Sequence, residues 1–185
     1  SGGPAEGGSG VNLVLDGRYI QDHYPGVGRY AFELATHLAP ATGNDRLLLL
    51  HDPLAPNHRF DIEALAANPQ VDLIAVSYSP LGLRQHLIVP PLVQRAGGTI
   101  YLAPHWGAPR GLSCPLVLTV HDLTPWLLRD SFQPPWRRWA YKRLMRGAVR
   151  RAVAVVVSSK ATRGDLTRLI PHHSPVTVAP LGVDA

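Results

Sequence analysis

Short apolar runs alternate along the chain with longer segments in which apolar residues return every three or four positions. Most positions of the runs are apolar and do not alternate with polar ones, which is typical of strands buried on both faces of a parallel sheet. The runs lie at residues 11–15, 47–50, 71–76, 99–102, 116–120, 153–157 and 176–179. The segments with helical spacing lie at residues 27–38, 62–67, 81–96, 134–151 and 159–169. This order predicts an α/β fold: a Rossmann-like parallel sheet with helices on both faces.

Prolines and glycines mark where two of these helices are interrupted or end. We expect the first helix to stop at Pro40 and Gly43, because neither residue continues a helix well. Pro90 and Pro91 instead fall inside the helical pattern of residues 81–96. A proline in a helix interior removes a hydrogen bond and clashes with the preceding turn, so we expect a kink or two separate pieces there.

Polar and ionisable residues follow directly after several of the predicted strands. In a parallel sheet the carboxyl ends of the strands meet at one edge, and ligands bind there near a switch point of the strand order. The residues at these ends are Asp16 with the glycine-containing loop, His51, His105, His121 with Asp122, and Ser158 with Ser159. The sequence therefore predicts a binding site at this edge.

The segment Pro25–Ala31 contains the string G-x-G-x-x-A, with Gly26 and Gly28 as its glycines. Glycines before a helix let the backbone approach an anion, and the helix N-terminus offers free N–H groups to it. A dinucleotide fingerprint would place this turn directly after the first strand, with an acidic residue at a set spacing. About ten residues separate Asp16 from Gly26, and that acidic residue is missing. A phosphate- or acceptor-binding loop and a plain glycine turn remain open.

His121 has two interpretations that the residues alone do not separate. It could bind a substrate hydroxyl or transfer a proton, or it could close a strand end with Asp122 as a structural partner. The nine histidines show no zinc spacing such as H-E-x-x-H, and the adjacent His172 and His173 would point apart, so we expect no metal. A Ser-His-Asp hydrolase is disfavoured because no G-x-S-x-G string occurs.

The composition narrows the class of protein. A chain of 185 residues with 45% hydrophobic and 17% charged residues suits one compact domain and is too apolar for disorder. The longest aliphatic run, residues 152–157, is too short to span a bilayer. Residues 1–10 are half glycine and read as an unstructured tail or a cloning remnant, not a secretion signal. The single Cys114 fits a reducing compartment, so we expect a cytoplasmic location.

The net charge of +5 is concentrated in one helix. Seven of the eighteen Lys and Arg residues fall between Arg137 and Arg151. A stripe at four-residue spacing lies beside Trp136 and Trp139 and consists of Arg138, Lys142, Arg146 and Arg150. The stripe is either a solvated face or a weak contact with anionic lipid at the inner face of the membrane. We expect no nucleic-acid partner, because no nucleic-acid-binding module accompanies the charge.

A series of motifs runs in a fixed order from residue 11 to residue 185. They are VNLVLDGRYI, YPGVGRYAFELATHL, LRQHLIVPPLVQRAGGTIYLAPHW, CPLVLTVHDLTPWLLRDSF, WAYKRLMRGAVRRAVAVVVSSKATRGDL and VTVAPLGVDA. The series resembles the N-terminal domain of family-4 (group 1) glycosyltransferases, most closely their bacterial mannosyltransferase-like branch. Val153 departs from the pattern, since the family usually has Asp there, and any salt bridge or cap made by that Asp is absent.

This resemblance implies the N-terminal half of a B-type glycosyltransferase. Residues 11–180 would form the acceptor-side domain, and residues 181–185 would begin the linker to a missing C-terminal domain. In relatives that domain holds the nucleotide and carries an E-x₇-E pair. The implied reaction is metal-independent and retaining, and moves a hexose, mannose by this resemblance, from a nucleotide-diphosphate sugar to a glycan or lipid-linked acceptor. The sugar nucleotide is a substrate, and no further cofactor is expected.

The resemblance also assigns residues. Gly26 and Gly28 would lie near the donor diphosphate, and His121 would be the catalytic histidine close to the transferred sugar. The expected acceptor-side residues are Asp16, Arg18, His105, Asp122, Ser158 and Lys160. Two other functions remain open, a sugar- or nucleotide-binding module that has lost its chemistry and a dinucleotide-dependent oxidoreductase.

Overall fold

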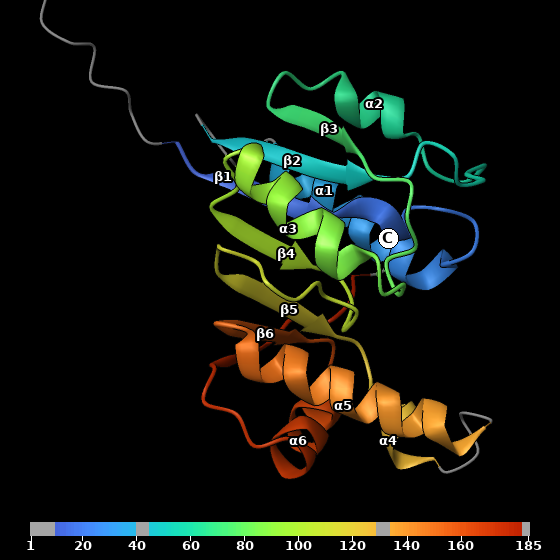
Figure 1. Ribbon diagram of the computed structural model, residues 1–185, viewed down its shortest axis with the longest axis vertical. Coiled ribbons are helices and arrows are strands. Elements are labelled where there is room, and N and C mark those ends of the chain that lie inside the picture. Colours follow the sequence, from blue (N-terminus) through green and yellow to red (C-terminus); the bar gives the residue numbers. More distant parts are fainter. Residues whose placement is uncertain (1–9, 40–44, 129–133, 183–185) are drawn as a thin grey trace, which may run out of the picture.

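The computed structural model describes residues 10–39, 45–128 and 134–182. Within them, seven parallel strands form one sheet in the order β3-β2-β1-β4-β5-β6-β7 (Figure 1). The strands are β1 Asn12–Asp16, β2 Arg46–His51, β3 Val71–Ala75, β4 Ile100–Ala103, β5 Leu116–Val120, β6 Ala154–Val157 and β7 Val176–Val178. The Rossmann-like parallel sheet predicted from the apolar runs is confirmed.

Helices connect the strands along most of the chain. They are the 3-10 helix η1 Gly17–Tyr19, α1 Pro25–Leu38, α2 Ile62–Ala66, α3 Gln85–Arg95, α4 Thr124–Leu127, α5 Pro135–Arg151 and α6 Lys160–Leu169. The predicted elements start and end within two residues of these bounds, with the exception of α3. The sequence pattern did not predict η1 and α4, because three or four residues are too few to show a period.

The helix α3 differs from its prediction in two ways. It begins at Gln85, and it continues through Pro90 and Pro91 as one helix, so the alternative of two pieces is wrong. Val89 and Val93 are fully buried in the core beside these prolines. Tertiary packing of this kind outweighs the loss of two backbone hydrogen bonds.

The end of the first helix and the chain termini are only partly described. The helix α1 ends at Leu38, and the amide of the next residue, Ala39, donates to Ala35. The predicted stop signals Pro40 and Gly43, residues 1–9 of the expected tail and residues 183–185 of the expected linker lie outside the described residues.

Two apolar cores lie on opposite faces of the sheet. On β1, Leu15 belongs to one core and Val14 to the other, because successive strand residues point to opposite faces. Ala31 and Ala35 of α1 pack with Leu15, whereas residues of α3 and α5 pack with Val14. Figure 1 shows α3 and α5 in front of the sheet and α1 behind it. Helices therefore cover both faces, as the sequence predicts.

The strand order reverses between β1 and β4. From β1 the chain proceeds outward through β2 to β3, and from β4 it proceeds in the other direction through β5, β6 and β7. The loops that leave the carboxyl ends of β1 and β4 therefore diverge and leave a crevice between them. In this fold the crevice is the expected position of a ligand site.

The basic stripe of α5, which the sequence leaves as either a solvated face or a contact with anionic lipid, packs in part against α4. Arg138 donates from Nη2 to the carbonyl oxygen of Trp126 at 2.7 Å. Lys142 and Arg146 place their charged groups 5.0 and 5.1 Å from the centre of the Trp126 ring. Three members of the stripe thus pack on α4 through cation–π contacts and a hydrogen bond, and only Arg150 is exposed.

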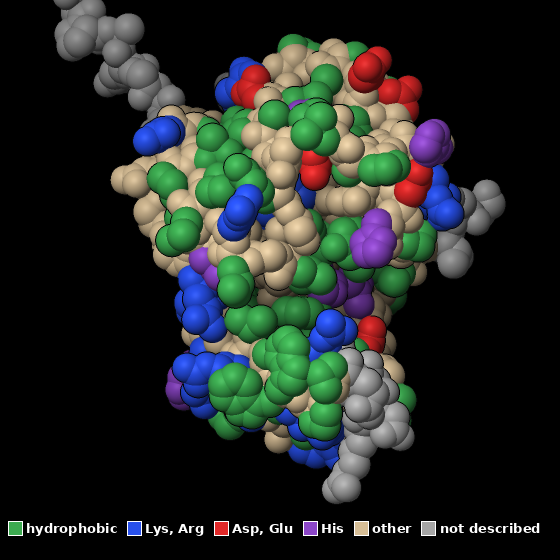
Figure 2. Space-filling view, turned by 45° about the vertical axis from the view of Figure 1, so that its right-hand side comes forward, with side chains coloured by type: hydrophobic (Ala, Val, Ile, Leu, Met, Phe, Trp, Pro, Cys, Tyr) green, Lys and Arg blue, Asp and Glu red, His purple; other side chains and the backbone are tan. Residues whose placement is uncertain are grey.

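Charge is distributed unevenly over the surface. In Figure 2 Lys and Arg side chains gather at the lower end of the molecule, where α5 and α6 lie. Most of the Asp and Glu side chains on this face lie at the upper end, near β3 and α2. None of the described helices has the length and apolarity that a membrane crossing requires.

Candidate functional site

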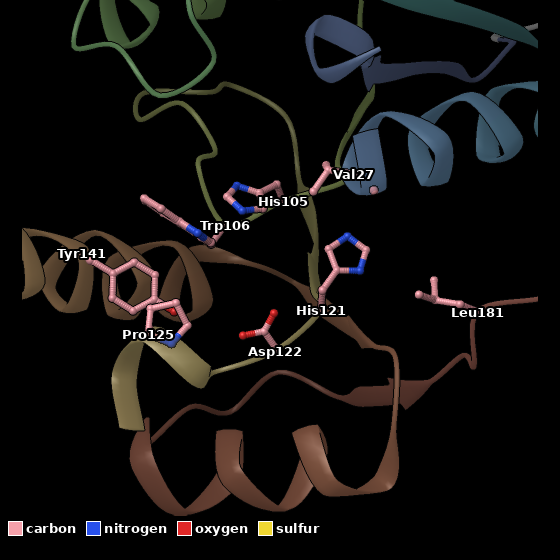
Figure 3. A pocket seen from close by; sticks show the side chains of 9 residues that line it. Val27, His105, Trp106, His121, Asp122, Pro125, Tyr141 and Leu181 are labelled. Carbon is pink, nitrogen blue, oxygen red and sulfur yellow. The ribbon is translucent and has the colours of Figure 1, made fainter. Parts of the chain in front are cut away.

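A cleft of about 300 Å³ opens at the carboxyl edge of the sheet (Figure 3). Its volume is at the lower end of the range that small-molecule sites occupy. The lining residues come from the start of α1, the loops after β4 and β5, α4, α5 and the C-terminal segment. They are Gly26, Val27, His105, Trp106, His121, Asp122, Pro125, Tyr141 and Leu181. The structure thus brings four predicted site residues together in one cleft: Gly26, His105, His121 and Asp122.

His121 stands at the end of β5 with its ring held on two sides. Its Nε2 lies 2.9 Å from the carbonyl oxygen of Pro104, and its ring meets the Tyr30 ring edge to face at 4.8 Å. Because a carbonyl only accepts hydrogen bonds, Nε2 carries the hydrogen of the neutral ring. Burial lowers the pKa of His121, although Pro104 and Asp122 oppose the shift. A neutral His121 therefore offers Nδ1 as a hydrogen-bond acceptor.

The backbone of His121 is fixed from the side of β6. The Ser158 hydroxyl donates to the carbonyl oxygen of His121 at 2.6 Å, and the Thr162 hydroxyl donates to the same oxygen at 3.2 Å. The amide of Thr162 also donates to the hydroxyl of Ser159, the N-cap of α6. The predicted residue Ser158 therefore positions the histidine and does not line the cleft.

His105 is a second neutral histidine in the cleft. Its Nδ1 lies 3.3 Å from the hydroxyl of Tyr19, which is almost fully buried. Burial, and then the charge of Asp16, raise the pKa of Tyr19, so its hydroxyl keeps its proton and donates to Nδ1. Burial, and then the charge of His121, lower the pKa of His105 to about 4. Both histidines are thus uncharged near neutral pH.

The N-terminus of α1 points unsatisfied amides at the cleft. Pro25 is its first residue, and the side chain of Tyr24 makes no capping hydrogen bond. The amide of Gly28 makes the first helical hydrogen bond, to Tyr24 at 2.6 Å. Helix geometry therefore leaves the amides of Gly26 and Val27 without an intrahelical acceptor, where they can bind an anion with the support of the helix dipole.

The two predicted glycines have different roles. Gly26 is exposed, and an added Cβ would meet open space. Gly28 is buried, and an added Cβ would lie 2.7 Å from the carbonyl oxygen of Tyr19 and 3.2 Å from the Phe60 ring. Gly28 thus lets α1 pack against the loop after β1, and it does not itself line the cleft.

Aromatic side chains form one wall of the cleft. Trp106 meets the Tyr141 ring edge to face, with the ring centres 5.0 Å apart. Burial, and then the charge of Asp122, raise the pKa of Tyr141, so its hydroxyl stays protonated. Asp122 accepts a hydrogen bond from the amide of Thr124 through Oδ1 at 2.8 Å, which orders the start of α4. The carboxylate itself faces the cleft (Figure 3).

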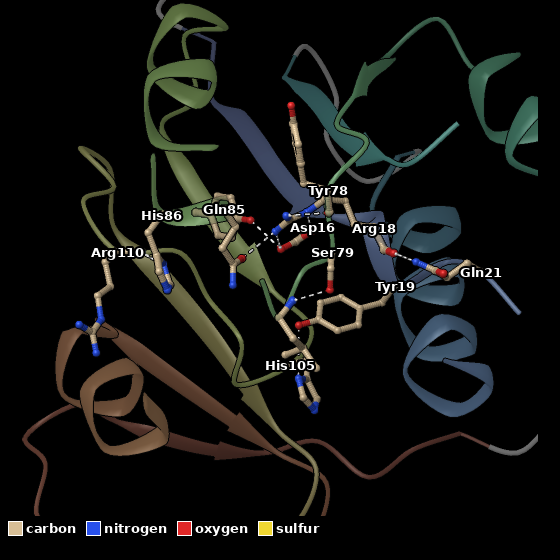
Figure 4. Close-up of polar contacts among 12 residues, drawn as sticks. Asp16, Arg18, Tyr19, Gln21, Tyr78, Ser79, Gln85, His86, His105 and Arg110 are labelled. Atoms are coloured by element: carbon tan, nitrogen blue, oxygen red, sulfur yellow. Dashed lines mark hydrogen bonds and ion pairs between the residues drawn. The ribbon is translucent and has the colours of Figure 1, made fainter. Parts of the chain in front are cut away.

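The predicted acceptor-side residues Asp16 and Arg18 are buried and do not line the cleft. Arg18 donates from Nε and Nη2 to the two carboxylate oxygens of Asp16 at 2.7 and 2.6 Å (Figure 4). Tyr101 also donates to Asp16, and Gln85 accepts from Arg18. Burial alone would lower the pKa of Arg18, but the charge and hydrogen bonds of Asp16 raise it above its ordinary value. The group ties β1 to β4 and α3 beneath η1, which carries Tyr19.

Lys160 is also outside the cleft. It is the exposed first residue of α6, beyond the Ser159 cap. Among the described residues no cluster of three or more His, Cys, Asp or Glu side chains could hold a metal ion.

Several residues of the site were missed by sequence reasoning. Tyr30 falls within the helical segment predicted at residues 27–38, but its hydroxyl lies 3.1 Å from Oγ1 of Thr119 and its ring contacts that of His121. Trp106 and Tyr141 come from segments 35 positions apart, so no local pattern joins them. Trp106 directly follows His105, and that adjacency is the one signal that could have marked it.

Comparison with known proteins agrees with this architecture. The family model described as Glycosyltransferase Family 4 matches residues 24–185. Sucrose-phosphate synthase from Thermosynechococcus elongatus is similar in structure, with a TM-score of 0.64 and 15% identity over 94% of this chain and 49% of that one. A shorter chain of the same synthase gives a TM-score of 0.52 and 13% identity over 94% and 90%. The likeness shows the fold, that of the N-terminal domain of a B-type glycosyltransferase.

The chain spans about half the length of the longer synthase chain. No curated protein matches it.

Proposed function

The chain belongs to glycosyltransferase family 4, and we propose that it is the acceptor-side half of an enzyme that transfers a hexose, most simply mannose. The donor is a nucleoside-diphosphate sugar, and the acceptor is a glycan or a lipid-linked molecule. The family membership and the likeness of this fold to one half of a longer synthase chain support the proposal. A second domain would close over the open side of the cleft and hold the nucleotide.

One observation carries the proposal. The free amides at the start of α1 and the neutral His121 face the same cleft, one from each side of the strand reversal. A leaving diphosphate develops negative charge, and preorganised N–H groups at a helix N-terminus stabilise such charge without reorganisation. A sugar bound beside it would place its hydroxyls within reach of Nδ1 of His121, which accepts a hydrogen bond, and of Nε2 of His105, which donates one.

Each residue then has a defined task. The amides of Gly26 and Val27 bind the diphosphate, and Nδ1 of His121 accepts a hydrogen bond from a sugar hydroxyl. Ser158 and Thr162 hold His121 in place through its carbonyl oxygen. The ion pair of Asp16 and Arg18 holds η1 in place, and Tyr19 of η1 orients His105 through its hydroxyl.

A dinucleotide-dependent oxidoreductase fits the geometry less well. That function needs a tight turn from the first strand into the helix. Here η1 and residues 20–24 separate β1 from α1. A binding module without catalysis shares the same cleft, and turnover separates it from a transferase.

The test is the effect of His121→Ala on the full-length enzyme. We expect kcat to fall about a hundredfold, the scale of a lost positioned hydrogen-bonding or proton-transfer group. Release of nucleoside diphosphate from a panel of sugar nucleotides measures the rate and identifies the donor. His37→Ala is a matched control, because His37 lies on α1 with a side chain that is 77% exposed. Unchanged turnover in a folded His121→Ala variant would contradict the proposed role.

We also propose that the α4–α5 region makes a weak contact with an anionic membrane. The predicted basic stripe is mostly packed on Trp126, but the neighbouring Trp136 and Trp139 are 64% and 66% exposed. Leu127 and Leu128 of the α4 end are exposed as well. Arg137 and Arg143 lie over the two exposed tryptophan rings, at 5.7 Å each. Exposed tryptophans beside arginines suit the headgroup region of an anionic bilayer.

Vesicle co-sedimentation tests this contact. We expect the full-length protein to pellet with vesicles that contain anionic lipid, less so with neutral vesicles, and less as salt rises. The double variant Trp136→Ser with Trp139→Ser should lose most of the pelleting, whereas Leu54→Ser, which removes an apolar side chain that is 79% exposed elsewhere, should not. Equal pelleting with anionic and neutral vesicles would contradict an electrostatic contact.

A further inference from the structure

Two arginines converge on one point beside the cleft. A Cβ added at Gly147 of α5 would lie 3.2 Å from Nη1 of Arg151 and 4.0 Å from Nη2 of Arg110. The amide of Arg110 donates to Nδ1 of His86, which fixes the loop that carries this arginine (Figure 4). The two guanidinium groups, from α5 and from the loop after β4, thus approach the same point, and both arginines are exposed.

Neither arginine has an acidic neighbour in the described part of the chain. No carboxylate of residues 10–39, 45–128 or 134–182 forms an ion pair with Arg110 or Arg151. Partial burial, and then the charge of Arg110, lower the pKa of Arg151. A pair of like charges held together without a counter-charge is stabilised by a bound anion.

The surroundings of the pair are apolar on one side and adjoin the cleft at Trp106 on the other. The arginines lie in a shallow hollow with Leu81, Leu83 and Leu144, and Trp106 lines both this hollow and the cleft. Leu83 and the nearby Leu87 of α3 are each 79% exposed. About 20 Å³ of the hollow admits a water-sized group, so an anion would lie at its mouth.

We propose that Arg110 and Arg151 form a phosphate-binding subsite for an acceptor that carries a phosphate ester on an apolar chain. A phosphate ester can carry close to two negative charges, which matches two guanidinium forks better than one carboxylate does. The apolar chain lies on Leu83 and Leu87, and the accepting end of the molecule reaches the cleft past Trp106. The assignment as acceptor rests on the proposed transferase function, whereas the binding of the phosphate does not.

Binding of small soluble probes to the full-length protein tests the subsite without turnover. The probes are inorganic phosphate, hexanoate and dihexanoyl phosphatidic acid below its micelle concentration, each titrated by calorimetry. We expect the lipid phosphate to bind more tightly than inorganic phosphate, and hexanoate to bind more weakly than either. Arg110→Gln and Arg151→Gln should each lower the affinity for inorganic phosphate and for the lipid phosphate about tenfold or more. This is the scale of a lost charge-assisted hydrogen-bonded pair.

Two further variants separate the parts of the subsite. The double variant Leu83→Ser with Leu87→Ser should lower the affinity for the lipid phosphate and leave the affinity for inorganic phosphate unchanged, since only the lipid contacts these leucines. Arg95→Gln, at an exposed arginine of the same helix α3, should change neither affinity. Thermal melts show that each variant is folded before its affinity is compared.

The outcomes are distinct. Unchanged phosphate affinity in folded Arg110→Gln and Arg151→Gln overturns the subsite, and equal affinity for hexanoate overturns its preference for phosphate. Equal affinity for inorganic and lipid phosphate overturns the proposal that an apolar chain binds on Leu83 and Leu87. A His121→Ala enzyme with normal turnover would refute the proposed catalytic site and leave these binding results as they are.

Discussion

The buried pair of Asp16 and Arg18 allows a quantitative prediction for Asp16→Ala. The side chain of Asp16 is 1% exposed and that of Arg18 is 0% exposed. Removal of Asp16 leaves the guanidinium buried without its counter-charge and the Tyr101 hydroxyl without its acceptor. Breaking a buried pair from one side lowers the free energy of unfolding by about 3–5 kcal/mol. That is a large part of the roughly 5–15 kcal/mol that a domain has in total.

A second substitution in the same pair tests the cause of this loss. If the stranded charge is responsible, Arg18→Met added to Asp16→Ala should restore about half of the lost free energy or more, because an apolar side chain of similar length needs no counter-charge. Tyr101→Phe, which keeps the ion pair, should lower the free energy of unfolding by only about 1 kcal/mol. Urea unfolding followed by circular dichroism measures all three variants.

An exposed pair on the same sheet provides the control. Arg46 of β2 and Asp72 of β3 form a bidentate pair with side chains that are 47% and 42% exposed. Solvent screens this pair, so Asp72→Ala should leave the free energy of unfolding close to that of the wild type. Equal losses for Asp16→Ala and Asp72→Ala, or no recovery in the Asp16→Ala, Arg18→Met double variant, would refute the argument from burial.

Two other residues of the site give shorter predictions. The folded pKa of His105 lies near 4 and its unfolded value near 6.5, so the unfolded chain binds more protons between these pH values and stability falls as the pH falls through them. His105→Gln should remove up to about 3 kcal/mol of that acid dependence, and an unchanged pH profile of unfolding would contradict the shift. Gly28→Ala should lower the thermal midpoint because its Cβ would meet Tyr19, whereas Gly26→Ala, with open space around it, should not. A Gly28→Ala midpoint at or above that of Gly26→Ala would count against this packing.

The fold could be predicted because local pattern and global topology agree. Most positions of the strands are apolar and do not alternate with polar ones, and the helices of five or more residues show a helical period. The exception is α3, where the prolines point to a break and the packing of Val89 and Val93 keeps the helix whole. Local propensity is a weak guide where tertiary burial is strong.

The site could be predicted only in part, because position along a strand does not reveal the direction of a side chain. His121 and Asp16 both end a strand, yet His121 lines the cleft and Asp16 points into the core. Tyr101, which donates to Asp16, and Gln85, which accepts from Arg18, lie far from this pair in sequence. The spacing of Asp16 and Arg18 by one residue is compatible with a buried pair, but it equally describes two solvated charges.

The charges of the cleft are divided between its parts, and this division matters for the chemistry proposed. Burial keeps His105 and His121 neutral near pH 7, so Nδ1 of His121 can accept a hydrogen bond and Nε2 of His105 can donate one. Protonated histidines would instead compete with the amides of α1 for the diphosphate and would offer no acceptor to a sugar hydroxyl. Positive potential is supplied by the helix N-terminus and, beyond Trp106, by Arg110 and Arg151, whose charge does not change with pH in the physiological range. In the proposed mode the cleft binds an anion at the N-terminus of α1 and hydroxyl groups beside it, and the adjoining hollow binds a second anion.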